Sequence, residues 1–442
     1  MLTLPTSRKS RKRIGWLIAA VAFIVGGSLW WQAIHTLHRV VKAPTRLVPS
    51  PNAWDYFRQA GASLSKSDAV SEQAFAFSAQ KASPLVAMNG PAFKLVKQGL
   101  RYEYLRPETG SQSKDFAMFS SLTRLLVLRA RVREAKGDWS GAMGDRLDAM
   151  EMGAKIQHGE ALMGFLVGVG KQTIARRRSL ALVDHLNSRD AFSAARRMAD
   201  IDASQTPCVV SLQLDKFQTQ KTIASMFSHD NPVGVAKSIV YAERQGLLMA
   251  NKLGEMFGPN GHIAAIPSAR ESSWRLIWIA MEPYDKAMDS YTSYVDACIT
   301  AAKMPYQQGV RAPITKPTDP IGTFLVNESL PKARTRQAIN DCGNRILELQ
   351  LALRAYHLDH RQYPDSLSKL TPECLPRVPD DPFADPAPFH YRRAATGFVL
   401  YSVGPDGVDN HGTPIVDSSR NKLTRYSVRG GETGDFVAGI NY

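Results

Sequence analysis

The stretch "INDCGNRILELQLALRAYHLDHRQYP", Ile339 to Pro364, has an apolar residue at every third or fourth position. The spacings of 3, 4, 3, 4 and 3 connect Ile339, Cys342, Ile346, Leu349, Leu353 and Tyr356. This is the period of an α-helix with one apolar face. The other faces carry Arg334, Arg345, Glu348 and Arg354. We expect the helix to end near "QYPDSL", because Pro364 disfavours helical geometry in Tyr363.

The residues after this helix change to a β pattern. Two short β-compatible runs, His390–Arg392 and Phe398–Val403, are separated by "AATG", which predicts an antiparallel hairpin. Further strands are expected at 415–416, 424–428 and 436–440. Before the hairpin, Asp365 is expected to cap a short helix that contains Leu367 and Leu370. The C-terminal part should therefore be a long helix packed on a small antiparallel sheet.

The middle of the chain is predicted to be helical. A helical pattern begins at "NAWDYF", Asn52–Phe57, and the strongest periodicity covers Lys114–Asp200. Within it, Gly137 can end one helix in a left-handed conformation and Asp138 can cap the next, which predicts a helical hairpin. Further helices are expected at 192–201, 212–227, 236–257 and 272–303. The hairpin resembles a tetratricopeptide unit, but no 34-residue period accompanies it, so plain helical packing is the favoured interpretation and a peptide-binding groove the alternative.

The N-terminal end has a basic block followed by an uncharged run. The block contains Arg8, Lys9, Arg11, Lys12 and Arg13. Residues 14–34 lack charge and include Trp16, Trp30 and Trp31. About 20 apolar residues cross a bilayer as a helix, and a basic flank stays in the cytoplasm. We therefore predict a single-pass anchor in the inner (cytoplasmic) membrane, with the bulk of the chain in the periplasm or outside. A cleaved signal peptide is the alternative.

These patterns divide the chain, and the overall fold class expected is α+β, mostly α. The expected parts are a cytoplasmic basic tail (1–13), a transmembrane helix (14–34), a stalk (35–51), a helical extracytoplasmic region (52–304), a linker or loop (305–330) and an α+β domain (331–442). The linker is expected because four prolines fall between Pro305 and Pro320.

Composition limits the possible functions. The 442 residues are 44% hydrophobic, so the chain can bury a large core. The net charge of +15 includes the five cations of the basic block, and the rest is spread thinly, which argues against nucleic-acid binding. The cysteines are too scattered for a zinc site and form either disulfides or buried thiols. They are Cys208, Cys298, Cys342 and Cys374.

Three motifs of the C-terminal part occur in a known order. They are "LALRAYHLDHRQYP" at Leu351–Pro364, "DPF" at Asp381–Phe383 and "FVLYSVGPDGVDN" at Phe398–Asn410. This order resembles the soluble domain of the type II secretion major pseudopilin (G-type), over about the last quarter of the chain. The whole chain also resembles a group of uncharacterised bacterial membrane-anchored proteins. Residues 35–330 separate the anchor from the long helix, whereas the two are continuous in pseudopilins, so the resemblance implies the fold and not the filament.

The loop "YSVGPDGVDNHG", Tyr401–Gly412, is the candidate metal site. The matching pseudopilin loop resembles a calcium site, and calcium prefers six to eight hard oxygen ligands. The candidate ligands are Asp406, Asp409, Asn410 and Asp417. Gly404, Gly407 and Gly412 permit the tight backbone such a loop needs. A Pro-Asp-Gly turn without metal is the alternative.

The catalytic patterns in the chain are weak. "GFLVGVGKQT", Gly164–Thr173, departs from a phosphate-binding loop in its glycine spacing and in Gln172, and is better explained as a packed helix. Two H-x-x-H pairs, His35 with His38 and His357 with His360, have no third ligand nearby. We therefore expect no catalytic site.

The expected function is that of a membrane-anchored structural or protein-interaction module of the bacterial envelope, related to secretion. Its partners would be membrane lipid, through residues 14–34, and an envelope protein. The alternative is an extracytoplasmic hydrolase with a site in the helical region.

Overall fold

The computed structural model describes residues 26–27, 47–64, 77–107, 112–227, 282–384, 386–395, 397–417, 422–423, 428 and 432–440. The chain divides into two compact units. The larger unit comprises residues 45–215, 295–314 and 327–442, and the described part of the smaller unit lies mainly in 216–294 and 315–326. The expected α+β domain at 331–442 lies in the larger unit, which also contains residues 45–215 and with them much of the helical region.

The membrane prediction falls on residues that the structure largely leaves out. Of the expected anchor at 14–34, only Gly26 and Gly27 are described, and the expected helix at 236–257 lies outside the described residues. Among the helices that are described, none has the length and apolar character needed to cross a bilayer. The anchor therefore stays a prediction.

The larger unit begins with three short helices, α2 (Ala53–Ala62), α3 (Ala79–Met88) and α4 (Gly90–Gly99). Helix α2 begins where the sequence predicted, because the side chain of Asn52 accepts a hydrogen bond from the backbone N–H of Trp54 at 3.1 Å. Helix α2 packs against α4 and against the next long helix.

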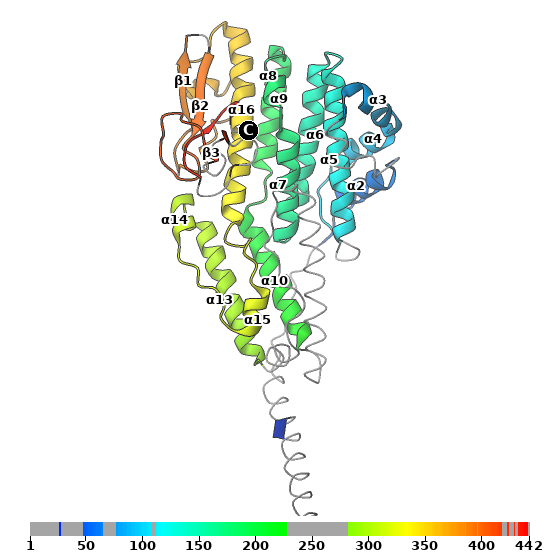
Figure 1. Ribbon diagram of the computed structural model, residues 1–442. Coiled ribbons are helices and arrows are strands. Elements are labelled where there is room, and N and C mark those ends of the chain that lie inside the picture. The colour runs from blue at the N-terminus through cyan, green and yellow to red at the C-terminus, as the bar shows by residue number, and fades with distance from the viewer. Residues whose placement is uncertain are drawn as a thin grey trace, which may run out of the picture. The chain divides into compact units, whose positions relative to one another are not determined.

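The central helices of the larger unit are α5 (Gln112–Glu134), α6 (Trp139–Gln157), α7 (Leu162–Arg176), α8 (Leu180–Val183) and α9 (Ser188–Ala203). The predicted hairpin between α5 and α6 is confirmed: Gly137 has a φ of +74°, and Asp138 accepts a hydrogen bond from the N–H of Gly141 at 2.9 Å. Helices α5, α6, α7 and α9 run side by side (Figure 1).

Small residues bring α6 and α7 into close contact. A Cβ atom added to Gly153 of α6 would lie 2.8 Å from the carbonyl oxygen of Gly168 in α7. The sequence "GFLVGVGKQT" therefore forms a packed helix, as expected, and its Gly168 lies against the backbone of Gly153.

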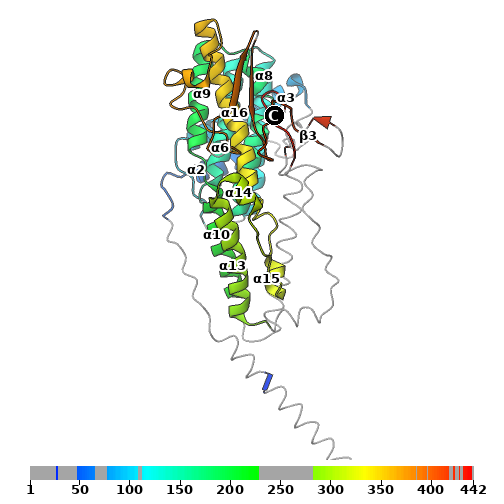
Figure 2. The same cartoon turned by 90° about the vertical axis from the view of Figure 1, so that its left-hand side faces the viewer.

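The long C-terminal helix, α16 (Ala333–His360), packs against α9, α7 and α8 on one side and against strand β2 on the other (Figures 1 and 2). It ends as predicted, and the next residue, Arg361, has a left-handed φ of +60°. The expectation of one apolar face was incomplete. Because α16 has neighbours on opposite sides, its polar residues Asn340, Asp341, Asn344 and Glu348 are also buried.

The sheet follows α16. Strands β1 (His390–Ala394), β2 (Gly397–Ser402) and β5 (Phe436–Val437) form an antiparallel sheet in the order β1-β2-β5, which confirms the hairpin. Strands β3 (Val416–Asp417) and β4 (Lys422–Leu423) pair separately. Of the strand expected at 424–428, only Val428 is described. The chain is thus mostly helical with a small antiparallel sheet, as the sequence predicted.

One predicted cap is wrong. The short helix is present as the 3-10 helix η3 (Leu367–Leu370), but Asp365 does not cap it. The carboxylate of Asp365 instead lies 2.9 Å from a guanidinium nitrogen of Arg393 in β1, because the hairpin brings this arginine to it.

The remaining helices are α10 (Cys208–Met226), α13 (Tyr284–Lys303), α14 (Tyr306–Arg311) and α15 (Pro320–Leu325). The expected linker at 305–330 thus contains two short helices, and Tyr306 is buried against Phe383 in the larger unit. Within the smaller unit, Gln220 of α10 donates to Thr292 of α13 at 2.9 Å.

Candidate functional site

The predicted metal loop lies between β2 and β3, and its carboxylates accept backbone hydrogen bonds. Asp406 accepts from the N–H groups of Val408 at 3.1 Å and Gly434 at 3.0 Å. Asp409 accepts from the N–H of His411 at 2.8 Å and from the hydroxyl of Tyr401 at 3.1 Å. Each glycine named for this loop has a positive φ, with values of 71°, 71° and 84°.

The structure adds an acidic residue to this loop that the sequence analysis missed. Asp435 is buried, and its carboxylate accepts from the N–H groups of Asn410 at 3.1 Å and Gly412 at 2.6 Å. Burial raises the pKa of Asp435, and the nearby carboxylates of Asp409 and Asp406 raise it further. No local motif indicates Asp435, because it comes to the loop through the pairing of β5 with β2 and through its own backbone hydrogen bonds with Thr413 and Ile415.

The four predicted metal ligands are only partly brought together. Asp406 and Asp409 lie near Asp435, whereas Asn410 turns its side-chain N–H toward the carbonyl of Val408 at 2.9 Å. Asp417 lies in β3, where its backbone pairs with Lys422. Within the described ranges, no group of three or more His, Cys, Asp or Glu side chains is arranged to hold a metal ion. The calcium site therefore stays a prediction.

Two histidines flank Asp409 at the surface of the loop. The Nδ1 atoms of His390 and His411 lie 3.7 Å and 3.6 Å from its Oδ2. The N–H of His411 lowers the pKa of Asp409, and the two imidazoles lower it as well. The ring of His390 also stacks on Tyr401, whose pKa is raised to about 12 by burial and by Asp409.

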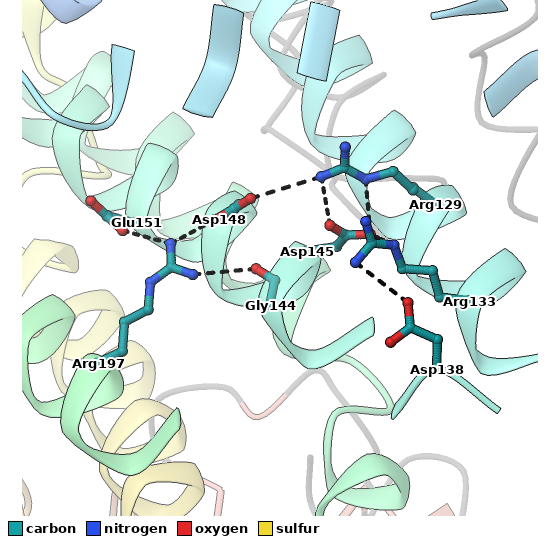
Figure 3. Close-up of polar contacts among 8 residues, drawn as sticks. All are labelled: Arg129, Arg133, Asp138, Gly144, Asp145, Asp148, Glu151 and Arg197. Carbon is teal, nitrogen blue, oxygen red and sulfur yellow. Dashed lines mark hydrogen bonds and ion pairs between the residues drawn. The ribbon is translucent and has the colours of Figure 1, made fainter. Parts of the chain in front are cut away.

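The helical region contains a partly buried ion-pair network, which we call the α5–α6–α9 network (Figure 3). Its charged members are Arg129, Arg133, Asp138, Asp145, Asp148, Glu151 and Arg197. Arg129 of α5 holds Asp145 with two hydrogen bonds, of 2.9 Å and 2.5 Å. Burial raises the pKa of Asp145, although Arg129 and Arg133 oppose the shift.

Arg197 extends the network from α6 to α9. Its guanidinium lies 2.6 Å from Asp148 and 2.8 Å from Glu151, and it donates to the carbonyl oxygen of Gly144 at 3.4 Å (Figure 3). The carboxylates of the network thus pair with arginines, which do not give up their protons in proteins. This arrangement holds three helices together and offers no evident acid or base for catalysis.

A second polar network fastens α16 to α7. The side-chain oxygen of Gln172 accepts hydrogen bonds from Asn340 at 3.2 Å, Asn344 at 2.7 Å and Gln205 at 2.8 Å. Arg176 also donates to the side chain of Asn344. The contacts of Gln172 with Asn340 and Asn344 join residues that are 168 and 172 positions apart in the chain.

Lys171 lies one residue before this network and is buried. Its Nζ donates to the hydroxyl oxygen of Ser120 at 2.8 Å, and Ser120 donates to the carbonyl oxygen of Phe116. Burial lowers the pKa of Lys171 to about 7, and Arg124 contributes to the shift.

Within the described residues, His357, His360 and the cysteines belong to no group of side chains that could hold a metal ion. His360 stacks on Tyr356, and His357 stacks on Tyr363 at the end of α16. His35 and His38 lie outside the described residues. The four cysteines are buried and form no disulfide in the described part of the chain, so the thiol alternative is the one the structure shows. Burial raises the pKa of Cys208 to about 12 and that of Cys374 to about 11.

Comparison with known proteins gives no match to a family model, to a curated protein or to a solved structure.

Proposed function

We propose that this chain is a membrane-anchored module of the bacterial envelope, whose folded part lies outside the cytoplasm and binds a protein partner there. The observation that carries the proposal is the uncharged run at 14–34 directly after the basic block at 8–13. Cations next to a bilayer-spanning segment favour the cytoplasmic side, so the remaining chain would be exported. A role in secretion rests on the pseudopilin resemblance of the C-terminal motifs.

The internal pairing of charges supports a binding role. In the α5–α6–α9 network the carboxylates face arginines, and α16 is fastened to α7 through side-chain amides. Such contacts fix the helices relative to one another. A partner would therefore be bound by the exposed residues that these helices carry.

The partner surface we propose lies around α14 and the Tyr401–Gly412 loop. Gln307 of α14 donates to the carbonyl oxygen of Pro405 at 3.4 Å, so the two segments touch. Met304 and Val310, three residues before and after Gln307, are 37% and 41% exposed, and Val408 of the loop is 55% exposed. Exposed apolar residues that gather in one area favour protein contact. Calcium, if it binds this loop, would order the same surface.

Crosslinking in intact cells tests this proposal. A photoreactive amino acid at Val310 or Val408 should capture the same envelope protein, identified by mass spectrometry. Met88 of α3 is a matched control position, because it is 46% exposed and apolar. Capture of lipid alone from positions 310 and 408, or the same captures from position 88, would count against the proposed surface.

A hydrolase is the second candidate function, and the Ser120–Lys171 pair is the observation that favours it. A serine hydroxyl next to an amine of lowered pKa can act as a nucleophile and its general base. The test is labelling of the full-length protein with a fluorophosphonate probe. Labelling that disappears in Ser120→Ala would support a hydrolase, and absence of labelling would exclude this pair as its site.

A further inference from the structure

A second group of buried charges lies between α9 and α16, and we call it the α9–α16 cluster. Its members are Asp202 of α9 and Asp341, Arg345 and Glu348 of α16. Positions 341, 345 and 348 follow one another at helical spacing, which places the three side chains on one face of α16. Helix α9 packs along α16, so Asp202 reaches this face.

The cluster contains more carboxylates than arginines. Arg345 pairs with Asp202, with 3.0 Å between Nε and Oδ2. Its Nη1 donates to the carbonyl oxygen of Asp380 at 2.9 Å. Asp341 and Glu348 are 6% and 3% exposed. Among the described residues, neither of these two carboxylates makes an ion pair within 4.0 Å.

Two oxygens in the cluster lack a hydrogen-bond donor. They are Oδ1 of Asp202 and Oδ1 of Asp341, both buried and without a partner in the described part of the chain. A buried carboxylate oxygen is costly without a donor, and a proton on one carboxyl supplies an O–H that can donate.

The surroundings also favour protonation. Burial, with a contribution from Asp202, raises the pKa of Asp341 to about 7, while Arg345, Arg334 and the side chain of Gln337 oppose the shift. Burial raises the pKa of Glu348 to about 8, with contributions from Asp202 and Asp200 against Arg345 and Arg377. These groups come from α9, from α16 itself and from the loop after η3.

We propose that Asp341 and Glu348, next to the ion pair of Asp202 with Arg345, form a buried proton-binding site that makes the packing of α16 against α9 sensitive to pH. With protons bound, the carboxyls of Asp341 and Glu348 are neutral and the interface is tight. As the pH rises the protons leave, and like charges remain buried against each other. In the proposed location outside the cytoplasm, the surrounding pH would set the stability of the long helix.

The sign of the effect follows from linkage. The pKa values in the folded protein, about 7 and about 8, lie above those of unfolded Asp and Glu, near about 4. The stabilisation is therefore complete below about pH 4 and is lost as the pH rises through about 7 to 8. Each carboxyl that releases its proton on unfolding raises the unfolding constant by up to about tenfold per pH unit.

Equilibrium unfolding of the full-length protein in detergent tests the proposal, over a series from about pH 5 to about pH 9. The free energy of unfolding of the wild type should fall as the pH rises. For the double variant D341N/E348Q it should fall less steeply with pH. Lys171 and other buried groups also titrate in this range, but they are common to both proteins. D359N is the matched control, because Asp359 lies on α16 and is exposed, and its slope should equal that of the wild type.

The same dependence of unfolding free energy on pH in the wild type and the double variant would overturn the proposal. If the double variant does not fold, D341N and E348Q are measured singly, and infrared spectroscopy of the wild type gives a second readout. A carbonyl band from protonated carboxyls should be present at about pH 6 and lost by about pH 9. Absence of that band would also overturn the proposal.

Discussion

The α5–α6–α9 network and the α9–α16 cluster both contain buried carboxylates, but they differ in how many arginines face them. In the network, Asp145, Asp148 and Glu151 lie 2.5, 2.6 and 2.8 Å from an arginine nitrogen. In the cluster, Arg345 pairs with Asp202, so among the described residues Asp341 and Glu348 have no arginine within ion-pair distance. Helix α9 takes part in both, through Arg197 in one and Asp202 in the other.

This difference shows how similar residues can have different roles in one fold. A buried carboxylate beside a guanidinium is a fixed structural contact. A buried carboxylate without one is stabilised by a proton. The first arrangement should be insensitive to moderate pH and intolerant of losing an arginine, whereas the second should respond to pH.

The largest expected effect is the loss of Arg129. The substitution Arg129→Met leaves Asp145 and Asp148 buried without this partner, and removing one member of a buried ion pair costs about 3–5 kcal/mol. Chemical denaturation of the full-length protein would measure it. Arg133→Met is the comparison, because Arg133 is 37% exposed and should cost much less. Equal losses of unfolding free energy in the two variants would contradict the view that the buried arginine contributes more than the exposed one.

Loss of Arg345 should depend on pH. Arg345→Met removes the arginine that lowers the pKa of Asp341 and Glu348, so their folded-state values rise further. We expect the loss to be larger near pH 9 than near pH 5 by about 1–2 kcal/mol, because Asp341 and Glu348 are protonated near pH 5 and become ionised as the pH rises. The same unfolding series measures both, and a loss independent of pH would contradict the proton-binding role.

Steric contacts provide a prediction that does not involve charge. Gly153→Ala places a Cβ against the backbone of Gly168 and should cost about 1–3 kcal/mol at every pH tested. Gly144→Ala is the control on the same helix, since no atom lies within 4 Å of its added Cβ. It should stabilise by up to about 1 kcal/mol through helix propensity. Similar stabilities for the two alanine variants would refute the close approach of α6 and α7.

The smallest expected effect concerns the loop. If calcium binds at Asp406 and Asp409, a free concentration about tenfold above the dissociation constant should stabilise the protein by about 1.4 kcal/mol. Melting of the full-length protein with millimolar calcium measures the gain, because residues 331–442 share a unit with the central helices. D406N/D409N should abolish it, and an unchanged melting temperature in the wild type would favour the metal-free turn.

The elements of the fold were largely accessible from sequence, because their signals are local. Periodicity located α16, Gly137 and Asp138 located the α5–α6 turn, and the spacing of two β runs located the β1–β2 hairpin. Each of these depends on residues a few positions apart.

The candidate sites were less accessible, because they depend on contacts between distant residues. Glu348 was assigned to an outer face of α16, and only the packing of α9 shows that it is buried. Gln172 was noted as a mismatch to a phosphate motif, and its role in holding Asn340 and Asn344 follows from a fold that joins α7 to α16. Asp435 reaches the loop through the β2–β5 pairing and its backbone hydrogen bonds with Thr413 and Ile415, residues that lie well before it in the chain.

Placement of the folded part outside the cytoplasm is the claim on which both the proposed partner and the meaning of pH dependence depend. A tag fused after Tyr442 in intact cells, probed with a membrane-impermeant reagent, tests it directly. If the folded part lies outside the cytoplasm, the reagent should label the tag as soon as it has access to the outer face of the inner membrane, while that membrane is still intact. Labelling only after the inner membrane is opened would contradict it.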